Sequence, residues 1–409
     1  MKKILFVIAI TSVFAFGCTV LDDVQTVNDG TGPILLSTEL QKRVAQDNEF
    51  ALDMLRNTIK EADESNVFIS PLSVSIALGM ARNGADGSTR TEMETALRMS
   101  GLSADKINQY YSIMLDSLPT ADSKTTLKIA NSIWYRNGFQ MKRPFLDINA
   151  SFFKAEIRSL DFSGVGAVDT INNWCALKTN NLINEVINEI PEMAMMYLIN
   201  AVYFKGQWTY QFEKKRTYQT NFTDELGHLT EVNMMNRIDT FAYYRDADGE
   251  YLDLPYGNGA FSMTVILPST GKTTGDVLEN LSTEHLNTAL RNLKKQKVAV
   301  SIPRFKAECK YELSAPLKAM GMKKAFEETA DFSKICDDVL FISSIIHKTY
   351  VEVTEEGTEA AAVTVVEFET TSMPDYPIFC ANKPFLFLIR EKGTGVILFA
   401  GKMGDVVKY

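Results

Sequence analysis

The sequence predicts an α+β fold. Its first third carries apolar residues at helical spacing, whereas the later parts contain several apolar runs of strand length. Helices that precede strands in this way are typical of α+β domains, because the two kinds of element segregate along the chain. The chain has 409 residues, 45% of them hydrophobic and 23% charged, which is an ordinary globular composition. We expect a single domain over residues 39–409, since no linker or internal repeat divides it.

Three helices are predicted near the N-terminus. In residues 38–62, leucine, valine, phenylalanine and isoleucine recur at helical spacing. Ser70 before Pro71 fits a helix start, with serine as the cap and proline in the first turn, and Gly84 ends this helix. Residues 89–96 form a third, short helix, in which Glu92 is placed for a capping box.

The predicted strands lie mainly later in the chain. Many are nearly continuous apolar runs, which indicates that both faces of each strand are covered. They span residues 128–135, 195–204, 261–267, 297–302, 345–354, 385–390 and 396–402.

The N-terminus has the pattern of a secretory signal. Residues 1–3 are basic, and residues 4–16 are an apolar run too short to span a bilayer comfortably. Gly17 then precedes Cys18. This order resembles a bacterial lipoprotein signal with Cys18 as the lipidated first residue, although Ala15 stands where leucine is usual. Simple secretion with an incidental cysteine is the alternative.

The expected processing divides the N-terminal region into two parts. Residues 1–17 are a lipoprotein-type signal peptide, and residues 18–38 are a polar tether. A lipid on Cys18 would make the membrane a partner and place the exported protein at the bacterial cell envelope or surface.

Charge and cysteine usage narrow the function classes. The net charge of -9 argues against nucleic-acid binding, which depends on lysine and arginine at phosphates. The cysteines after Cys18 form no CxxC or CxxH pattern, so we expect no zinc site, and nothing indicates another metal or a cofactor. They are scattered singly and are expected to be buried free thiols, with disulfide pairing in a secreted chain as the alternative: Cys175, Cys309, Cys336 and Cys380.

Residues 355–372, with the sequence EEGTEAAAVTVVEFETTS, are the most informative segment. Read with period two, the segment divides into an uncharged face and a face that carries its carboxylates after Gly357. Such a segment can lie in the middle of a sheet, and Gly357 provides backbone freedom for a hinge. A helix start and a permanent strand are the alternatives. The uncharged face holds Thr358, Ala360, Ala362, Thr364, Val366, Phe368 and Thr370, and the other holds Glu359, Glu367 and Glu369.

Several blocks of sequence carry a family resemblance. SNVFISPLSVSIALGMARNGADGSTRTEM begins at Ser65, NAVYFKGQW at Asn200 and YLDLPYGNGAFSMTVILP at Tyr251. IPRF, DFSKI, IHKTYVEVTEEGTEAAA and the closing NKPFLFLIREKGTGVILFAGKM follow in that order. Together these blocks resemble the serpins, and the resemblance covers residues 40–409.

The resemblance implies a fold of three β-sheets and eight or nine helices, with an exposed reactive loop at about residues 355–379. It also implies roles for particular residues. The hinge of the loop comprises Glu355, Gly357, Thr358, Ala360 and Ala362. The shutter, a polar cluster under the central sheet, comprises Ser70, Ser73, Asn200 and His347. Trp208 matches the aromatic residue of the breach, where the loop enters the sheet.

The resemblance further implies a metastable, monomeric suicide substrate for serine endopeptidases, with cysteine endopeptidases as a further class. The partner is the target endopeptidase, which is trapped as a covalent acyl-enzyme when the cut loop inserts into the central sheet. The family's spacing places the reactive bond at Thr371–Ser372, with Ser372–Met373 as the nearest alternative. Thr371 is small and uncharged, which favours an elastase-like protease over a trypsin-like one. Phe368 could serve a chymotrypsin-like enzyme, and a cut at Glu367 or Glu369 would suit a glutamate-specific protease.

Two other function classes are weaker. The chain has three histidines and contains no HExxH motif, GxSxG motif or phosphate-binding glycine loop, so we expect no enzyme activity. A non-inhibitory serpin, acting as a binding or scaffold protein, is the second alternative. The small residues Thr358, Ala360, Ala362 and Thr364 on the inserting face argue against it.

Overall fold

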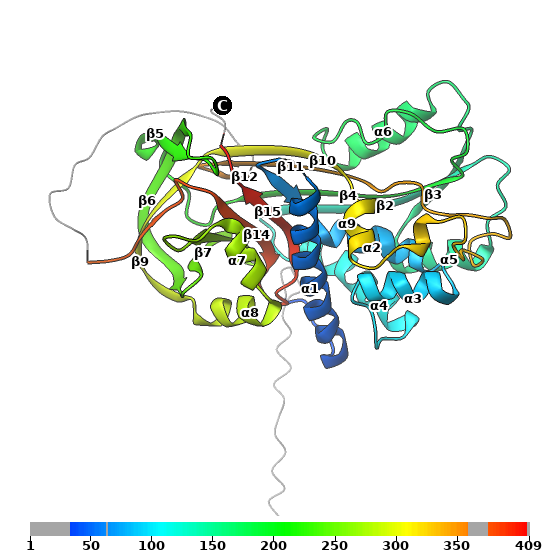
Figure 1. The fold of residues 1–409 in the computed structure, drawn as a ribbon, viewed down its shortest axis with the longest axis horizontal. Helices are drawn as coiled ribbons and strands as arrows, with labels where there is room; N and C mark the ends of the chain where they lie inside the picture. The colour runs from blue at the N-terminus through cyan, green and yellow to red at the C-terminus, as the bar shows by residue number, and fades with distance from the viewer. Residues whose placement is uncertain (1–32, 63, 359–374, 407–409) are drawn as a thin grey trace, which may run out of the picture.

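The computed structural model describes residues 33–62, 64–358 and 375–406. These residues form an α+β fold whose helices and strands segregate as the sequence predicts (Figure 1). The described part contains nine α-helices, in agreement with the expected number: α1 (Thr38–Glu61), α2 (Pro71–Arg82), α3 (Gly87–Ala96), α4 (Ala104–Ser117), α5 (Arg143–Phe153), α6 (Ala167–Lys178), α7 (Thr274–Asn280), α8 (Thr283–Asn292) and α9 (Ser314–Ala319). None of the described helices has the length and apolar character needed to cross a bilayer.

One sheet has six strands in the order β10-β11-β12-β4-β2-β3. It lies in the middle of the molecule, and its long strands run between the two ends (Figure 1). The strands are β10 (Phe305–Glu312), β11 (Ile346–Thr354), β12 (Gly357–Thr358), β4 (Met196–Gln207), β2 (Thr125–Arg136) and β3 (Glu156–Leu160).

The second sheet has nine strands. Its main path is β1-β15-β14-β8-β7-β6-β9-β13, and β5 pairs with β6 beside it. The strands are β1 (Val67–Ile69), β15 (Ile397–Met403), β14 (Phe385–Glu391), β8 (Phe261–Pro268), β7 (Gly249–Tyr256), β6 (Leu229–Arg245), β9 (Lys294–Pro303), β13 (Ile378–Cys380) and β5 (Tyr218–Thr223).

The three expected sheets are hydrogen-bonded here as two, because β6 belongs to two groups of strands. It has 17 residues, of which Leu229–Met234 pair with β5, Met234–Tyr243 pair with β9 and Ala242–Arg245 pair with β7. The groups on either side of β6 are therefore counted as one sheet in the described part of the chain.

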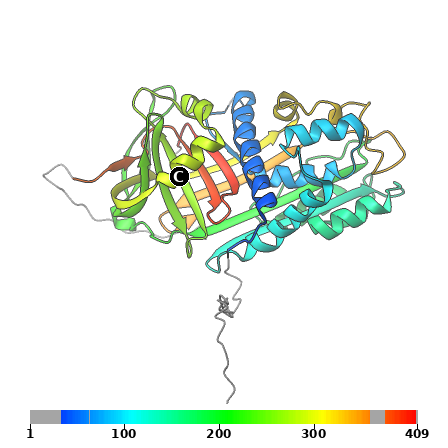
Figure 2. The same ribbon diagram turned by 90° about the horizontal axis from the view of Figure 1, so that it is seen from below.

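Helices cover both faces of the six-stranded sheet. Helix α6 lies on one face, and α2 lies on the opposite face with α1, α4 and α5 near it (Figures 1 and 2). A separate small core beneath α6 contains Trp134, Trp174 and Ile199. Figure 2 also shows α1 crossing between the strand-rich end of the molecule and the helix-rich end.

The N-terminal helices confirm one predicted cap and correct another. Ser70 caps α2 through its side chain, which accepts a hydrogen bond from the Ser73 N–H, and Pro71 lies in the first turn as predicted. The predicted capping box of Glu92 is wrong. Helix α3 begins at Gly87 after Asp86, and Glu92 instead accepts hydrogen bonds from backbone N–H groups of the distant segment that contains Lys324.

Candidate functional site

The predicted hinge enters the six-stranded sheet as the short strand β12. Gly357 pairs with Thr354 of β11 on one side and with Gln207 of β4 on the other, and Thr358 pairs in the same way with Val353 and Gly206. Both pairings are antiparallel. The start of the predicted reactive loop is therefore already a strand between β11 and β4. Of the other predicted loop residues, Ala360, Ala362, Thr371 and Ser372 lie outside the described residues, as do Cys18 and the signal peptide.

Gly357 lies where no other residue would fit. Its φ is +144°, a backbone conformation that L side chains rarely adopt. A Cβ atom at this position would lie 2.1 Å from the carbonyl oxygen of Gly206 and 2.6 Å from the Cα of Gln207. Glycine at the hinge therefore allows the backbone to approach β4 closely, in addition to giving the hinge rotational freedom.

Thr358 fixes which face of the segment points inward. Its side chain is 5% exposed, and its hydroxyl lies 2.9 Å from the hydroxyl of Tyr256. Burial raises the pKa of Tyr256, so this phenol is neutral and can share the hydrogen bond in either direction. Because successive strand residues alternate between faces, the uncharged face predicted from the sequence is the one that starts in the core.

Two ion pairs hold the residues just before β12. Glu355 is 1% exposed, and Arg304 donates to both of its carboxylate oxygens at 2.9 Å from Nε. The hydroxyl of Thr217 donates to the same carboxylate at 2.5 Å. Glu356, the next residue, forms an ion pair of 2.7 Å with Lys214. Such a buried carboxylate with several donors is oriented rigidly, which anchors the base of the loop.

Trp208 contacts the hinge from the end of β4. Its indole N–H donates to the carbonyl of Thr354 at 2.9 Å, and its backbone N–H donates to the carbonyl of Glu356 at 2.8 Å. The indole stacks on Tyr256 at 4.4 Å between ring centroids. The residue expected at the breach therefore lies at the point where the chain enters the sheet.

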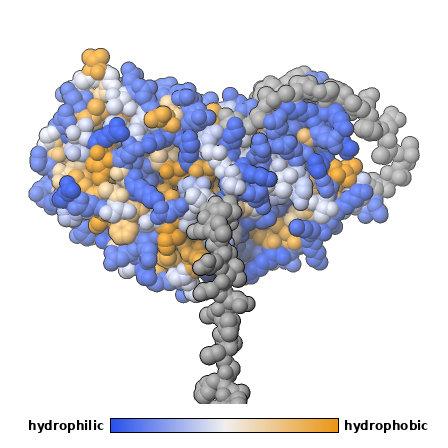
Figure 3. Space-filling model, turned by 180° about the vertical axis from the view of Figure 1, so that it is seen from behind, coloured by the Kyte–Doolittle hydropathy of each residue, from blue (hydrophilic) through white to orange (hydrophobic). Residues whose placement is uncertain are grey.

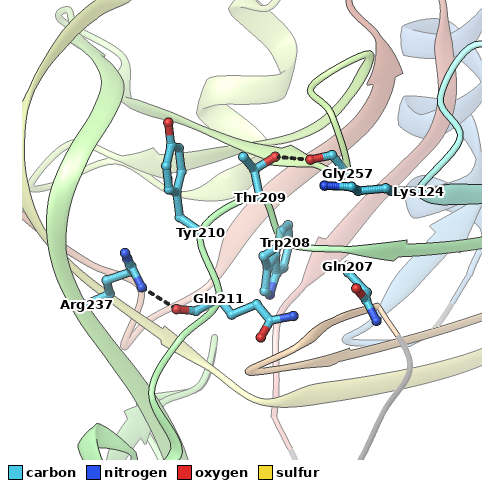
Figure 4. A pocket seen from close by; sticks show the side chains of 8 residues that line it. All are labelled: Lys124, Gln207, Trp208, Thr209, Tyr210, Gln211, Arg237 and Gly257. Atoms are coloured by element: carbon cyan, nitrogen blue, oxygen red, sulfur yellow. Dashed lines mark hydrogen bonds between the residues drawn. The ribbon is translucent and has the colours of Figure 1, made fainter. Parts of the chain in front are cut away.

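A surface pocket adjoins this segment. It has a volume of about 410 Å³, and it is lined by Lys124, Gln207, Trp208, Thr209, Tyr210, Gln211, Arg237 and Gly257. Figure 4 shows that the lining residues come from the end of β4 and the chain that follows it, from β6 and from two turns. Most of the lining side chains are polar, and Arg237 is held by Asp239 and by the carbonyl of Gln211.

The structure brings together three of the four predicted shutter residues. The backbone N–H of Ser70 donates to Nε2 of His347 at 2.9 Å, and the Ser70 hydroxyl accepts from the Ser73 N–H at 3.3 Å. Burial lowers the pKa of His347 to about 4, so the ring is neutral and its Nε2 can accept. Asn200 instead donates to Asn131 on the neighbouring strand at 2.6 Å.

Comparison with known proteins decides the family. The family model described as Serpin (serine protease inhibitor) matches residues 45–406. The chain belongs to the serpin family. Iripin-2 of Ixodes ricinus is 36% identical to this serpin over 377 residues, which are 90% of this chain and 94% of the relative. The family and its fold, which the sequence blocks predict, are both confirmed.

Solved structures of other serpins have the same fold as this chain. The native state of the thermophilic serpin tengpin has a TM-score of 0.82 and 33% identity to this serpin, and the match covers 91% of this chain and 95% of that one. Thyroxine-binding globulin in complex with thyroxine has a TM-score of 0.81 and 28% identity, with 90% and 100% covered.

Sequence reasoning assigned no hinge role to four residues that hold the hinge of this serpin: Arg304, Thr217, Lys214 and Tyr256. Each lies far from its hinge partner in the chain: the separation is 51 residues for Arg304 and Glu355, and 102 for Tyr256 and Thr358. Arg304 and Tyr256 do fall within the blocks IPRF and YLDLPYGN that carried the resemblance. A signal was therefore present, but it did not identify their partners.

Among the described residues, the cysteines are free thiols, and one group of acidic residues and a histidine comes close enough to hold a metal ion. Cys175, Cys309 and Cys336 are buried free thiols, as predicted, and Cys380 is a free thiol of intermediate exposure. Asp246, Asp248 and His285 bring ligand atoms within 4.8 Å of one another. These groups are already satisfied by protein partners, since His285 bonds to Asp246 at 2.8 Å and Lys272 forms an ion pair with Asp248.

Proposed function

We propose that this serpin is a suicide-substrate inhibitor of serine endopeptidases, with cysteine endopeptidases as a further class, and not an enzyme. A target protease would attack the reactive loop and form an acyl-enzyme. The cut loop would then insert into the six-stranded sheet and carry the tethered protease with it. Insertion of a cleaved loop as a new strand is established for serpins as a group. One observation carries the proposal: β12 already occupies the insertion position between β11 and β4.

The register of β12 specifies how the rest of the loop would continue. In the same register, Ala360, Ala362 and Thr364 would share the buried face of Thr358. Thr364 would come opposite Asn200 of β4 and His347 of β11, which are two of the predicted shutter residues. Glu359 and Glu367 would point to the opposite face. No carboxylate would therefore have to be buried on the core side of the inserted strand.

The energy of insertion is large enough for this mechanism. Each new backbone hydrogen bond contributes about 0.5–1.5 kcal/mol net, so a dozen would total on the order of ten kcal/mol. Burying Val366 and Phe368 would add about 1.5–3 kcal/mol each. A displacement near 1 Å in a protease active site can lower its rate about a hundredfold. The acyl bond would then survive, and the uncut molecule would be a kinetic trap.

The reactive bond is assigned to Thr371–Ser372, fourteen residues after Gly357 by the spacing of the family. Thr371 is a small, uncharged, β-branched residue, which fits an elastase-like pocket. The acidic pocket of a trypsin-like enzyme would favour a cation that Thr371 lacks.

Incubation with pancreatic elastase tests the proposal. We expect a covalent complex that survives SDS, together with a released C-terminal peptide whose mass places the cut after Thr371. Clean cleavage without a complex would contradict inhibition and favour a binding or scaffold serpin.

A pair of variants isolates insertion from cleavage. Thr358→Arg introduces a charge on the buried face, so we expect cleavage to continue while complex formation falls at least tenfold. Glu359→Arg places the same side chain on the opposite face at the next residue and should retain most of the complex. Equal loss of complex in both variants would contradict the proposed face.

We also propose that Cys18 is lipidated and anchors a monomeric protein at the cell envelope or surface. The support is the basic, apolar and small-residue order that precedes Cys18. An anchored inhibitor would protect the cell surface from foreign proteases. Labelling with radioactive palmitate should be lost in Cys18→Ser, and persistence of the label in that variant would exclude this site.

A further inference from the structure

Four exposed cations lie close together in the chain at the end of α8 and the start of β9. They are Arg291, Lys294, Lys295 and Lys297, and we call them the β9 basic patch. The whole chain carries a net charge of -9, so this concentration of positive charge is contrary to its overall balance. Within the described residues, no carboxylate forms an ion pair with any of the four, whereas exposed cations elsewhere, such as Lys215 and Lys334, do have acidic partners.

The β9 basic patch adjoins the C-terminal stem of the reactive loop. Strand β13 runs parallel to β9, with Ile378 opposite Ala299. Because the strands are parallel, residues before Ile378 lie beside residues before Ala299. The ammonium of Lys297 lies 4.5 Å from the ring centroid of Tyr376, a cation–π contact that fixes this arrangement. Asp375 directly precedes Tyr376 in the chain. In the described structure, no ion pair joins Asp375 to the patch.

The short length of chain between Tyr376 and the proposed reactive bond keeps that bond close to the patch. Ser372 is four residues before Tyr376, so the two are at most about 14 Å apart even in a fully extended chain. A protease engages residues on both sides of the bond that it cuts. Its surface on the leaving-group side must therefore lie close to β9. This end of the molecule is opposite α3 and α5 (Figure 1), and hydrophilic residues predominate on its face in Figure 3.

We infer that the β9 basic patch is a docking surface for an acidic region of the target protease. The inference rests on the proposed inhibitory function, because it places the protease at the loop. Unpaired surface cations raise the rate of encounter with an acidic partner, and they contribute more to rate than to final affinity. Such steering would compensate locally for the repulsion between an acidic protease and an acidic inhibitor.

The test compares two charge states of one protease. Pancreatic elastase is used untreated and after succinylation, which converts its lysines into carboxylates. In both forms the catalytic serine is converted to dehydroalanine, so that only the encounter complex forms. The variant Arg291→Gln/Lys294→Gln/Lys295→Gln removes three charges and keeps Lys297 at the stem. The matched control, Lys42→Gln/Lys60→Gln/Lys323→Gln, removes three exposed lysines from α1 and from the chain near residue 324.

We expect the patch variant to associate about tenfold more slowly than wild type with succinylated elastase at low ionic strength. The difference should shrink toward none at about 0.5 M salt, where the Debye length is a few ångströms. Untreated elastase should show little difference, and the control variant should match wild type with both forms. The SDS-stable complex is measured separately with active elastase. If no such complex formed while the patch still raised the association rate, the inhibitory function would be refuted and the docking surface would stand.

Equal association rates of wild type and patch variant with succinylated elastase would overturn the inference. So would a difference that emerges only when dextran sulfate is added, because the patch would then bind a linear polyanion and not the protease. Retention of the wild-type melting temperature in the patch variant shows that a slower rate comes from charge and not from misfolding.

Discussion

At the scale of single residues, the hinge depends on the absence of a side chain at Gly357. The close approach to Gly206 and the positive φ are separate demands, and both exclude a Cβ atom. We expect Gly357→Ala to expel β12 from the sheet or to destabilise the protein by about 1–3 kcal/mol. Thermal unfolding and loop proteolysis measure the two effects.

Gly259→Ala is the matched control for that prediction. Gly259 also has a positive φ, +99°, but a Cβ there would meet nothing within 4 Å. It should therefore show the cost of backbone strain alone, with no change in loop proteolysis. If the two alanine variants behaved alike, close approach at the hinge would not matter.

The neutral state of His347 gives a second prediction at this scale. Burial lowers its pKa to about 4, so the unfolded chain takes up a proton near pH 6.5 while the folded protein does not. Protons bound only by the unfolded state favour unfolding. The free energy of unfolding should therefore fall by about 3 kcal/mol through this group between pH 7 and pH 4.

Urea unfolding of wild type and His347→Gln at several pH values checks this. The variant should be less stable than wild type at pH 7, since Ser70 loses its acceptor, and it should lose less stability on acidification. A parallel decline in both proteins would assign the effect to other groups.

At the scale of secondary structure elements, His285 joins α8 to the turn between β6 and β7. Nε2 lies 2.8 Å from a carboxylate oxygen of Asp246, and Nδ1 lies 3.3 Å from the carbonyl of Asn280. Asp248 and Tyr251 also approach the ring. Burial alone would lower the pKa of His285, but the hydrogen bonds and the carboxylates outweigh it and raise the pKa above the ordinary value.

The raised pKa predicts a pH dependence of opposite sign to that of His347. The stabilisation by protonated His285 is complete below the unfolded pKa of about 6.5 and is lost as the pH rises through the folded value. The stability difference between wild type and His285→Gln should therefore shrink as the pH rises from 6 to 9. Unfolding in urea measures it, and a difference that grows with pH would contradict this account.

The strands show which elements could be predicted from local sequence. Continuous apolar runs led to β8, β14 and β15, because burial on both faces leaves a clear pattern. Strand β11 was also predicted, although its buried and less buried residues alternate. Strand β10 was not predicted, although its residues alternate strictly between buried and exposed. Strand β6 was not predicted either, because its 17 residues pair with several partners and mix polar and apolar side chains.

At the scale of the whole molecule, the proposed function requires that the intact fold is not the most stable one. Cleavage of the loop should allow β12 to lengthen between β11 and β4. A gain on the order of ten kcal/mol would raise the melting temperature by roughly 10–15 °C for a protein of this size. Calorimetry of the intact and elastase-nicked protein measures the change.

Thr358→Arg provides the control for that measurement, because its nicked form should gain little. A nicked wild-type protein that melts no later than the intact one would show that no insertion takes place. In that case β12 would be a permanent short strand, which was one of the alternatives left open by the sequence.

The sequence by itself determined the family and the start of α2 at Ser70, and it predicts the two faces of residues 355–372, of which the structure describes 355–358. These features depend on short-range patterns and on blocks of residues that can be read without knowing their neighbours in space. Only the tertiary structure decided that Arg304 and Thr217 hold Glu355, that Tyr256 meets Thr358, and that Asn200 pairs with Asn131. These contacts join segments that are far apart in the chain. The partners are therefore selected by strand pairing and register, which local sequence preferences do not determine.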